Sequence, residues 1–242
     1  MNKSTTTPLV YRGAIALVLC GCAAALLWPP LVPAAGEAIE IPAAEQPIPQ
    51  QPTATQTAVL AGGCFWGVEA VFEHVEGVVD VASGYAGGSA NTASYRATST
   101  GRTGHAEAVR IEYDPSVVGY TDLLQIFFSV AHDPTQVGGQ GPDRGSQYRS
   151  AIFALDDAQQ RAAQRYIAQL DAAQVYDAPI TTEVHDLTRD AFYAAEPYHQ
   201  DFATRHPNHP CIRAWDAPKL EALQAQFADR YRARPDLPIA DR

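Results

Sequence analysis

The stretch TAVLAGGCFWGVEAVFEHV, residues 57–75, decides the fold of this chain. Its first five residues are apolar enough to predict a short buried strand, and Gly62 and Gly63 then allow the backbone to turn. From Cys64 to Val75 the apolar residues recur at helical spacing and predict a helix with one buried face. That face consists of Val68, Val71, Phe72 and Val75. Cys64 is therefore expected at the point where a strand passes into the N-terminus of a helix.

The position of Cys64 indicates a reactive thiol. Unpaired N–H groups and the macrodipole at a helix N-terminus favour an anion, so we expect a lowered thiol pKa and a thiolate nucleophile. The alternative is a small buried cysteine that packs the strand against the helix. Phe65 and Trp66 follow directly in the first turn. Two large aromatic residues beside glycines favour an apolar pocket, and ordinary core packing is their alternative explanation.

The segment TGHAEAVRIEYDP, residues 103–115, contains a candidate acid. Its alternating pattern predicts a strand over 107–113 and places Glu107 on the apolar face of that strand. Burial disfavours the charged form of a carboxyl group, so the pKa rises and Glu107 can act as an acid near neutral pH. If the strand begins only at Ala108, Glu107 is solvated instead. His105 is explained equally well as a polar loop residue or as a catalytic one.

The rest of the chain predicts further strands and helices in an irregular order. Strands are predicted over 78–83, 150–155 and 180–184, and helices over 121–130, 156–175, 190–205 and 216–231. This order lacks the regular β-α-β rhythm of a doubly wound sheet. We therefore expect an α+β fold, a two-layer plait with a mixed β-sheet and packed helices, as a single catalytic domain over 57–234 with a tail at 235–242.

The N-terminal region has the composition of an export signal. In residues 1–35, Lys3 and Arg12 precede an apolar run that ends in prolines and small residues. A signal peptide is expected, with a retained membrane anchor or a lipid anchor at Cys22 as the alternatives. Residues 36–56 are rich in Pro and Gln and predict a flexible linker. All three readings of the leader place the domain outside the cytosol, in the periplasm or anchored on the extracytoplasmic side of the membrane.

Charge and composition exclude several partners. The chain has 17 Lys and Arg against 27 Asp and Glu, which gives a formal net charge of −10. We therefore expect no basic stripe that could neutralise phosphates, and no binding of nucleic acid. His206, His209 and Cys211 have a spacing that suggests metal ligands. Prolines between them prevent a helix from aligning these side chains and no fourth ligand is nearby, so no metal is expected.

Six motifs carry a resemblance to a known family. They are GGCFWGVEAVF, SGYAGG, TGHAEAVRIEYDP, HDPTQ, GPDRGSQYRSAIF and FYAAEPYHQDF, and in this order they resemble the peptide-methionine sulfoxide reductases of the A class over roughly residues 58–220. The resemblance implies a mixed-sheet plait that reduces methionine S-sulfoxide, free or in proteins. It implies no bound cofactor and a thioredoxin-like or small dithiol reductant. With the leader, it predicts a monomeric enzyme that repairs oxidised exported proteins.

The resemblance also implies roles for individual residues. These roles are a nucleophile for the sulfoxide sulfur, a pocket for the substrate methyl group, donors that protonate the sulfoxide oxygen, and supporting residues. By position they fall on Cys64 as the nucleophile, Phe65 and Trp66 as the pocket, Glu107 with Tyr95 and Tyr148 as the donors, and Asp143 and His199 as the supporting residues, with His199 at the periphery.

The chain departs from the common family pattern at Cys211. Many relatives have Pro-Tyr-Cys or Pro-Tyr-Ile before the Pro-Lys segment found here at 218–219, whereas this chain has Cys211 at the Tyr position, one residue before the usual recycling cysteine. A sulfenic acid formed on Cys64 needs a second thiol. We expect Cys211 to form a Cys64–Cys211 disulfide. The alternative is a free Cys211 with direct reduction of the sulfenic acid by an external thiol.

Two other classes of function compete with the reductase. A Cys–His hydrolase would use His105 or His199 to activate Cys64 for acyl transfer, but it leaves the second cysteine and the paired tyrosines unexplained. A non-enzymatic binding module is suggested only by the leader and the linker. Only the reductase would consume a thiol reductant on methionine sulfoxide.

Overall fold

The structure is a computed structural model that describes residues 39–48, 54–186 and 192–233. The leader predicted over 1–35 and the tail predicted over 235–242 lie outside these residues. No helix in the described ranges is both long and apolar enough to cross a membrane.

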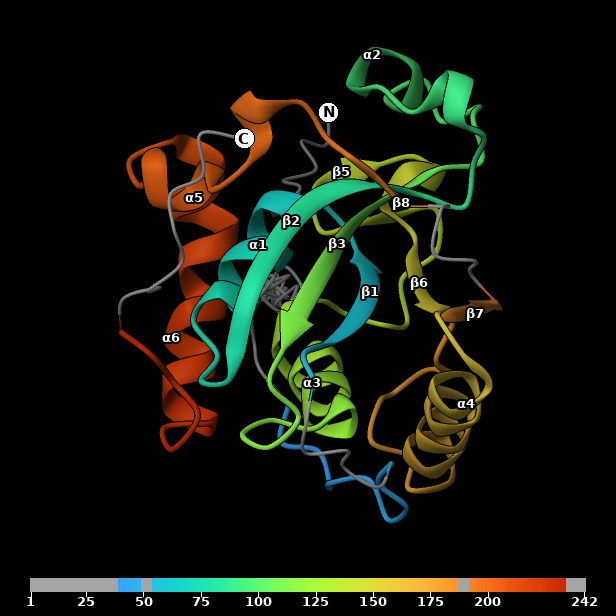
Figure 1. Ribbon diagram of the computed structural model, residues 1–242, viewed down its shortest axis with the longest axis vertical. Helices are drawn as coiled ribbons and strands as arrows, with labels where there is room; N and C mark the ends of the chain where they lie inside the picture. The colour runs from blue at the N-terminus through green and yellow to red at the C-terminus, as the bar shows by residue number, and fades with distance from the viewer. Residues whose placement is uncertain (1–38, 49–53, 187–191, 234–242) are drawn as a thin grey trace, which may run out of the picture. The chain divides into compact units, whose positions relative to one another are not determined.

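A six-stranded sheet forms the centre of the domain, in the order β7-β6-β1-β3-β2-β8 (Figure 1). Its strands are β1 (Gln56–Gly62), β2 (Val78–Ala86), β3 (Ala106–Tyr113), β6 (Ser150–Ala154), β7 (Glu183–Asp186) and β8 (Phe192–Ala194). All neighbouring strands are antiparallel except β6 and β7, which are parallel. The predicted α+β class with a mixed sheet is therefore confirmed.

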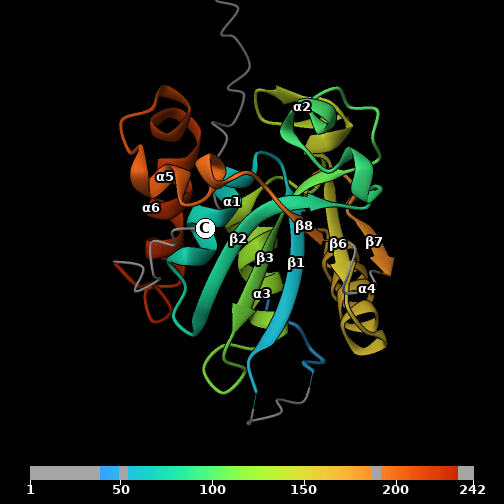
Figure 2. The ribbon, with the colours of Figure 1, turned by 45° about the horizontal axis from the view of Figure 1, so that its top comes forward.

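The two faces of the sheet differ in what covers them. Large side chains from one face pack with α1 (Phe65–Glu73), α3 (Tyr120–Ile126), α4 (Asp157–Ala172) and α6 (Ala217–Gln226) into the main core. The opposite face is lined mostly by small side chains together with one phenylalanine, namely Val59, Ala61, Ala86, Ala106, Ala108, Ala151 and Phe153. In Figures 1 and 2, α1 and α6 lie side by side and α4 lies at the β6–β7 edge. The four predicted apolar residues of α1 are all buried.

The strand register determines where the reactive residues meet. Leu60 of β1 pairs with Val109 of the antiparallel β3, so Gly62, two residues after Leu60, and Glu107, two residues before Val109, lie at the same end of the two strands. The turn after Gly62 leads directly into α1. Cys64 therefore enters the helix beside Glu107.

One predicted helix is wrong. In place of a helix over 190–205 the chain forms β8, the 3-10 turn η5 (Pro197–His199) and the single-turn helix α5 (Phe202–Arg205), and residues 187–191 are not described. Pro197 lacks an N–H donor, and Asp201 has a left-handed φ of 51°. Both features interrupt a helix, and the apolar residues before them pair with β2 at the edge of the sheet.

The described part of the predicted linker is packed against the domain, so the prediction of a flexible linker is wrong for residues 39–48. Ile41 is buried, and its carbonyl oxygen accepts a hydrogen bond from Gln125 Nε2 at 3.0 Å. Tyr166 Oη donates to the carbonyl of Pro42 at 2.6 Å. The segment buries one apolar side chain and satisfies its carbonyls with side chains of α3 and α4, so it needs no secondary structure of its own.

Candidate active site

The N-terminus of α1 holds a thiol and a carboxyl group together. Cys64 is the N-cap residue, and the backbone N–H of Trp66 in the first turn acts to lower the pKa of its thiol. The N–H of Phe65 donates to Glu107 Oε2 at 3.2 Å. The first N–H groups of a helix have no partner within the helix, so the N–H of Phe65 is available to the Glu107 carboxyl group. The predicted strand-to-helix position of Cys64 is confirmed.

The predicted direction of the Cys64 pKa shift is wrong. Burial of the thiol raises its pKa well above the usual value, and the negative charges of Glu107 and Asp216 raise it further. The backbone N–H of Trp66 acts in the opposite direction, but its effect is smaller. The resting sulfur therefore keeps its proton. A thiolate forms only if the neighbouring carboxyl groups are neutral or the proton can leave to an acceptor.

Glu107 lies on the buried face of β3, as its place in the alternating pattern predicted. Its side chain is 2% exposed, and burial raises its pKa to about 8. The N–H of Phe65 opposes this shift and the charge of Asp143 adds to it. At neutral pH the carboxyl group is mostly protonated, so it can donate a proton to a ligand in the pocket.

Two tyrosines and an aspartate reach the same space from loops. Tyr95 begins α2 (Tyr95–Thr98), Asp143 lies in the short strand β5 (Asp143–Arg144), and Tyr148 ends the 3-10 turn η3 (Ser146–Tyr148). Burial raises the pKa of both tyrosines, and the charge of Glu107 is the next largest cause in each. Burial also raises the pKa of Asp143. The structure therefore places these three residues around Cys64 and Glu107, where their hydroxyl and carboxyl groups act on one another.

Phe65 and Trp66 form an apolar wall beside the thiol. Phe65 is buried against Tyr85, with ring centroids 6.0 Å apart. Trp66 stacks on Phe202 at 3.7 Å with an interplanar angle of 9°. Its indole Nε1–H donates to His199 Nδ1 at 3.2 Å, which fixes the rotation of the ring. A wall of this kind can hold a small apolar group next to the sulfur.

His199 packs against the aromatic residues that surround the thiol. The ring is 2% exposed and lies 5.0 Å from the Phe65 ring and 4.6 Å from the Tyr95 ring, measured between centroids. Because Nδ1 accepts the indole N–H, the proton of the neutral ring is on Nε2. Burial lowers the pKa of His199, so the ring is neutral and serves to hold Trp66.

His105 holds the backbone of the preceding loop. Its Nδ1 accepts the N–H of Gly88 at 3.2 Å, and its Nε2 lies 3.1 Å from the carbonyl of Ser89. Both ring nitrogens are therefore used. With Nδ1 of His199 also occupied, the two histidines proposed for a hydrolase are engaged with other partners and not with Cys64.

The sequence analysis missed a buried ion pair at the site. Lys219 Nζ lies 3.3 Å from Asp216 Oδ1, and both residues are buried. The pair lies directly on Gly67, where a Cβ atom would collide with the Asp216 carboxylate and lie 2.8 Å from Lys219 Nζ. Asp216 also raises the pKa of Asp143. Glycine inside an amphipathic helix was the available signal, because it indicates close approach of another group.

Cys211 is a free, exposed thiol at the start of the π-helical turn η6 (Ile212–Asp216). Cys64 is also free, so the structure represents the reduced enzyme. The ring of His209 contacts Trp66 and Phe202.

Within the ranges given above, no group of three or more His, Cys, Asp or Glu residues is arranged to hold a metal ion.

Comparison with known proteins now identifies the family. A family model described as peptide methionine sulfoxide reductase matches residues 56–231. The chain belongs to this family. Peptide methionine sulfoxide reductase MsrA 2 of Synechocystis sp. is 53% identical over 188 residues, which cover 78% of this chain and 87% of that protein. The chain is thus an oxidoreductase of the A class that reduces methionine sulfoxide.

Solved structures of the same family share the fold. Methionine sulfoxide reductase A of Corynebacterium diphtheriae superposes with a TM-score of 0.56 at 35% identity, over 74% of this chain and 91% of that one. Mxr1 of Saccharomyces cerevisiae in reduced form gives a TM-score of 0.57 at 32% identity, over 67% and 91%. The sheet and helices described above are therefore those of a methionine sulfoxide reductase A.

Proposed function

We propose that this reductase acts on the S epimer of methionine sulfoxide, free or in oxidised proteins, with Cys64 as the nucleophile and Glu107 as the acid. The resemblance to the A class supports the choice of epimer. One observation carries the assignment of roles. The N–H of Phe65 donates to Glu107, and Cys64 is the N-cap of the same helix, so a proton donor and a sulfur lie at one helix N-terminus.

The first step transfers oxygen from the substrate to Cys64. Glu107 gives its proton to the sulfoxide oxygen, with Tyr95 and Tyr148 as further donors, while the sulfur of Cys64 attacks the sulfoxide sulfur. The S–O bond of the substrate and the S–S bond formed by the attack then both break, the oxygen passes to Cys64 as a sulfenic acid, and methionine leaves with two electrons gained. The proton of the thiol returns to Glu107. A neutral carboxyl group suits this step because a carboxylate would repel the departing oxygen.

The apolar wall selects the substrate. Phe65 and Trp66 hold the methyl group next to the sulfur, and His199 keeps the indole in place. The charge of Asp143 raises the pKa of Tyr148 and so helps to keep its hydroxyl protonated. No bound cofactor enters the step.

The second step uses Cys211. Its thiol attacks the sulfur of the sulfenic acid, a Cys64–Cys211 disulfide forms, and water leaves. A thioredoxin-like or small dithiol then supplies two electrons and two protons that restore both thiols. The exposure of Cys211 supports this step, because an external dithiol can approach it.

Cys64→Ser tests the assignment of the nucleophile. We expect loss of methionine release in a single-turnover assay with an unchanged near-ultraviolet circular dichroism spectrum, since oxygen replaces sulfur with little change in volume. Cys211→Ser is the matched control, because it removes the other thiol and is expected to retain one turnover. Substantial methionine release by Cys64→Ser would contradict the proposed function.

We also propose that the enzyme is exported and repairs oxidised proteins outside the cytosol as a monomer. The signal-like leader supports this location, and the only methionine, Met1, precedes the domain. Mass spectrometry of the mature protein would give its N-terminus and any lipid, and light scattering its mass in solution. An uncleaved, unmodified N-terminus on a cytosolic protein would contradict export.

A further inference from the structure

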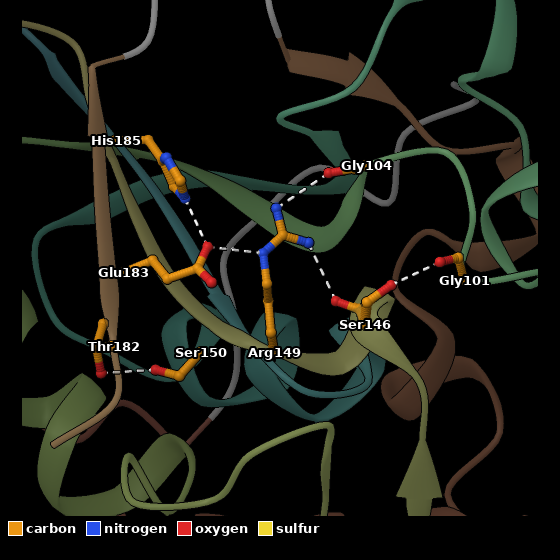
Figure 3. A network of polar contacts seen from close by, with 8 residues as sticks. All are labelled: Gly101, Gly104, Ser146, Arg149, Ser150, Thr182, Glu183 and His185. Atoms are coloured by element: carbon orange, nitrogen blue, oxygen red, sulfur yellow. Dashed lines mark hydrogen bonds and ion pairs between the residues drawn. The ribbon is translucent and has the colours of Figure 1, made fainter. Parts of the chain in front are cut away.

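Arg149 joins three separate segments beside the active site (Figure 3). Its guanidinium donates from Nη1 to the carbonyl of Ser146 at 3.0 Å and from Nη2 to the carbonyl of Gly104 at 3.0 Å. Its Nε donates to Glu183 Oε2 at 3.1 Å. Ser146 belongs to the turn that carries Tyr148, whereas Gly104 leads into β3 and Glu183 begins β7. One side chain therefore connects a turn to two strands of the sheet.

The surroundings of the guanidinium are tightly packed. A Cβ atom at Gly87 would lie 3.2 Å from Arg149 Nη2 and 3.3 Å from the carbonyl of Gly104, and Gly87 has a φ of 89° that favours glycine. A second link runs parallel to the first, since Ser146 Oγ donates to the carbonyl of Gly101 at 2.8 Å. The side chain of Arg149 is only 18% exposed. The arginine side chain is thus largely packed, whereas its ion-pair partner Glu183 is 49% exposed.

We propose that Arg149 is a positioning residue for the reductase step, which holds the η3 turn against the sheet so that the Tyr148 hydroxyl and the Glu107 carboxyl face the same substrate oxygen. This inference rests on the proposed function. Arginine suits the task because its planar fork presents N–H donors in several directions, whereas lysine offers a single point charge.

Arg149 acts through Tyr148 because Glu107 is already held by other contacts. Glu107 pairs with Tyr85 across the sheet, and its carboxyl group accepts the N–H of Phe65. Tyr148 lies in a three-residue turn whose backbone hydrogen bonds, from Tyr148 to Gly145 and from Arg149 to Ser146, lie within the turn itself. The side chain of Arg149 links that turn to β3 and β7.

A double-mutant cycle tests the inference in the full chain. Arg149→Met is expected to slow single-turnover methionine release by about 10- to 100-fold, the size of effect that misplacement by about 1 Å produces. In a Tyr148→Phe background the same substitution is expected to cost less than about twofold, because the residue it positions is already inactive. Alkylation of Cys64 by iodoacetamide is expected to be unchanged, since α1 is not linked to Arg149.

Three further variants complete the test. Arg149→Lys is expected to recover less than a tenth of the wild-type rate, and it replaces Arg149→Met if that variant does not fold. Glu183→Gln removes one of the three contacts, an exposed ion pair, and is expected to lower the rate by less than about threefold. Arg161→Met, which breaks an exposed ion pair with Asp157 on α4, is the matched control and is expected to have the wild-type rate.

The outcomes separate this inference from the proposed function. If the wild-type enzyme releases no methionine, the proposed function fails. If the wild-type enzyme is active and Arg149→Met matches it, or if the loss in Arg149→Met is equally large with Tyr148→Phe present, the proposed function stands and the positioning role of Arg149 is wrong.

Discussion

Glu107 and Cys64 affect one another through charge, because both lie at the N-terminus of α1 and an ionised Glu107 raises the pKa of the thiol. Glu107→Gln should therefore have two opposite effects. The thiol pKa should fall, so iodoacetamide should alkylate Cys64 faster at a given pH. Methionine release should slow by about 100-fold or more, because an amide cannot deliver the proton.

The pH dependence of the single-turnover rate checks the same residue. Since burial raises the pKa of Glu107 to about 8, the wild-type rate should fall as the pH rises through that value and the acid loses its proton. This decrease of the rate with pH should be absent in Glu107→Gln. The control Glu112→Gln, on the same strand, should show the same decrease as the wild type. A Glu107→Gln rate within about threefold of wild type, under ~1 kcal/mol of barrier, would show that another group is the acid.

Single residues also show that a sequence pattern predicts the place of a residue in its helix or strand better than it predicts the charges around that residue. The alternation along β3 correctly placed Glu107 on a buried face, because alternation is a local property of a strand. The helix N-terminus around Cys64 was also predicted, but the sign of its pKa shift was not. That sign depends first on burial of the thiol and then on the charges of Glu107 and of Asp216, which is 152 residues away in the sequence and was not expected at the site.

At the scale of elements, α1 buries acidic residues as well as apolar ones. Glu69 and Glu73 are 1% and 2% exposed. Glu69 accepts the N–H of Ser83 in β2, and Glu73 accepts the hydroxyl of Thr204 in α5. Burial raises the pKa of Glu69 to about 8 and that of Glu73 to about 9. The charge of Asp201 is the second cause for Glu69, and the charge of Glu69 is the second cause for Glu73. The folded state therefore holds protons that the unfolded chain has already released.

This arrangement predicts that stability falls as the pH rises. Below an unfolded pKa of about 4.5 both states hold the proton and the contribution is complete, and it is lost as the pH rises toward the folded pKa values of about 8 and 9. Each carboxyl group lowers the free energy of unfolding by up to about 1.4 kcal/mol per pH unit in that window. Glu69→Gln, which stays neutral, should show a smaller fall in Tm between pH 6 and 9. Glu76→Gln, at an exposed position just after the helix, should match wild type.

Helices and strands with a strong hydrophobic period could be predicted from the sequence. Elements whose structure depends on a neighbouring segment of the fold could not. The helix predicted over 156–175 begins at Asp157, and the side chain of Asp156 caps it by accepting the N–H of Gln159 at 2.8 Å. The helix predicted over 190–205 failed because a few apolar residues suit an edge strand and a helix equally. Only the neighbouring β2 decides between them.

At the scale of the whole molecule, the segment that carries Cys211 lies against the wall of the active site. Phe202, at the start of α5, stacks on Trp66, and the ring of His209 lies 5.8 Å from the Trp66 ring. Cys211 itself is exposed and free. This contact could not be predicted from a local sequence pattern, because it joins residues far apart in the chain. The packing of residues 39–48 on α3 and α4 was missed for the same reason.

Formation of a Cys64–Cys211 disulfide would join this exposed segment to the half-buried thiol of Cys64. The two Cα atoms must come within about 4.4–6.8 Å in the oxidised form. One equivalent of methionine sulfoxide should convert the reduced enzyme to that disulfide, detected by mass spectrometry after peptide digestion under non-reducing conditions. Pro207 and Pro210 restrict the backbone dihedral angles of the segment that carries Cys211.

Cys211→Ser separates the two steps of the reaction. The variant should still release one methionine per enzyme, because oxygen transfer needs only Cys64 and the proton donors. It should then stop turning over with thioredoxin, since thioredoxin attacks a disulfide and the variant holds only a sulfenic acid. Dithiothreitol is small enough to reach the sulfenic acid and should restore slow cycling. Unchanged thioredoxin-dependent turnover in Cys211→Ser would show that the sulfenic acid on Cys64 is reduced directly and that the shifted cysteine takes no part.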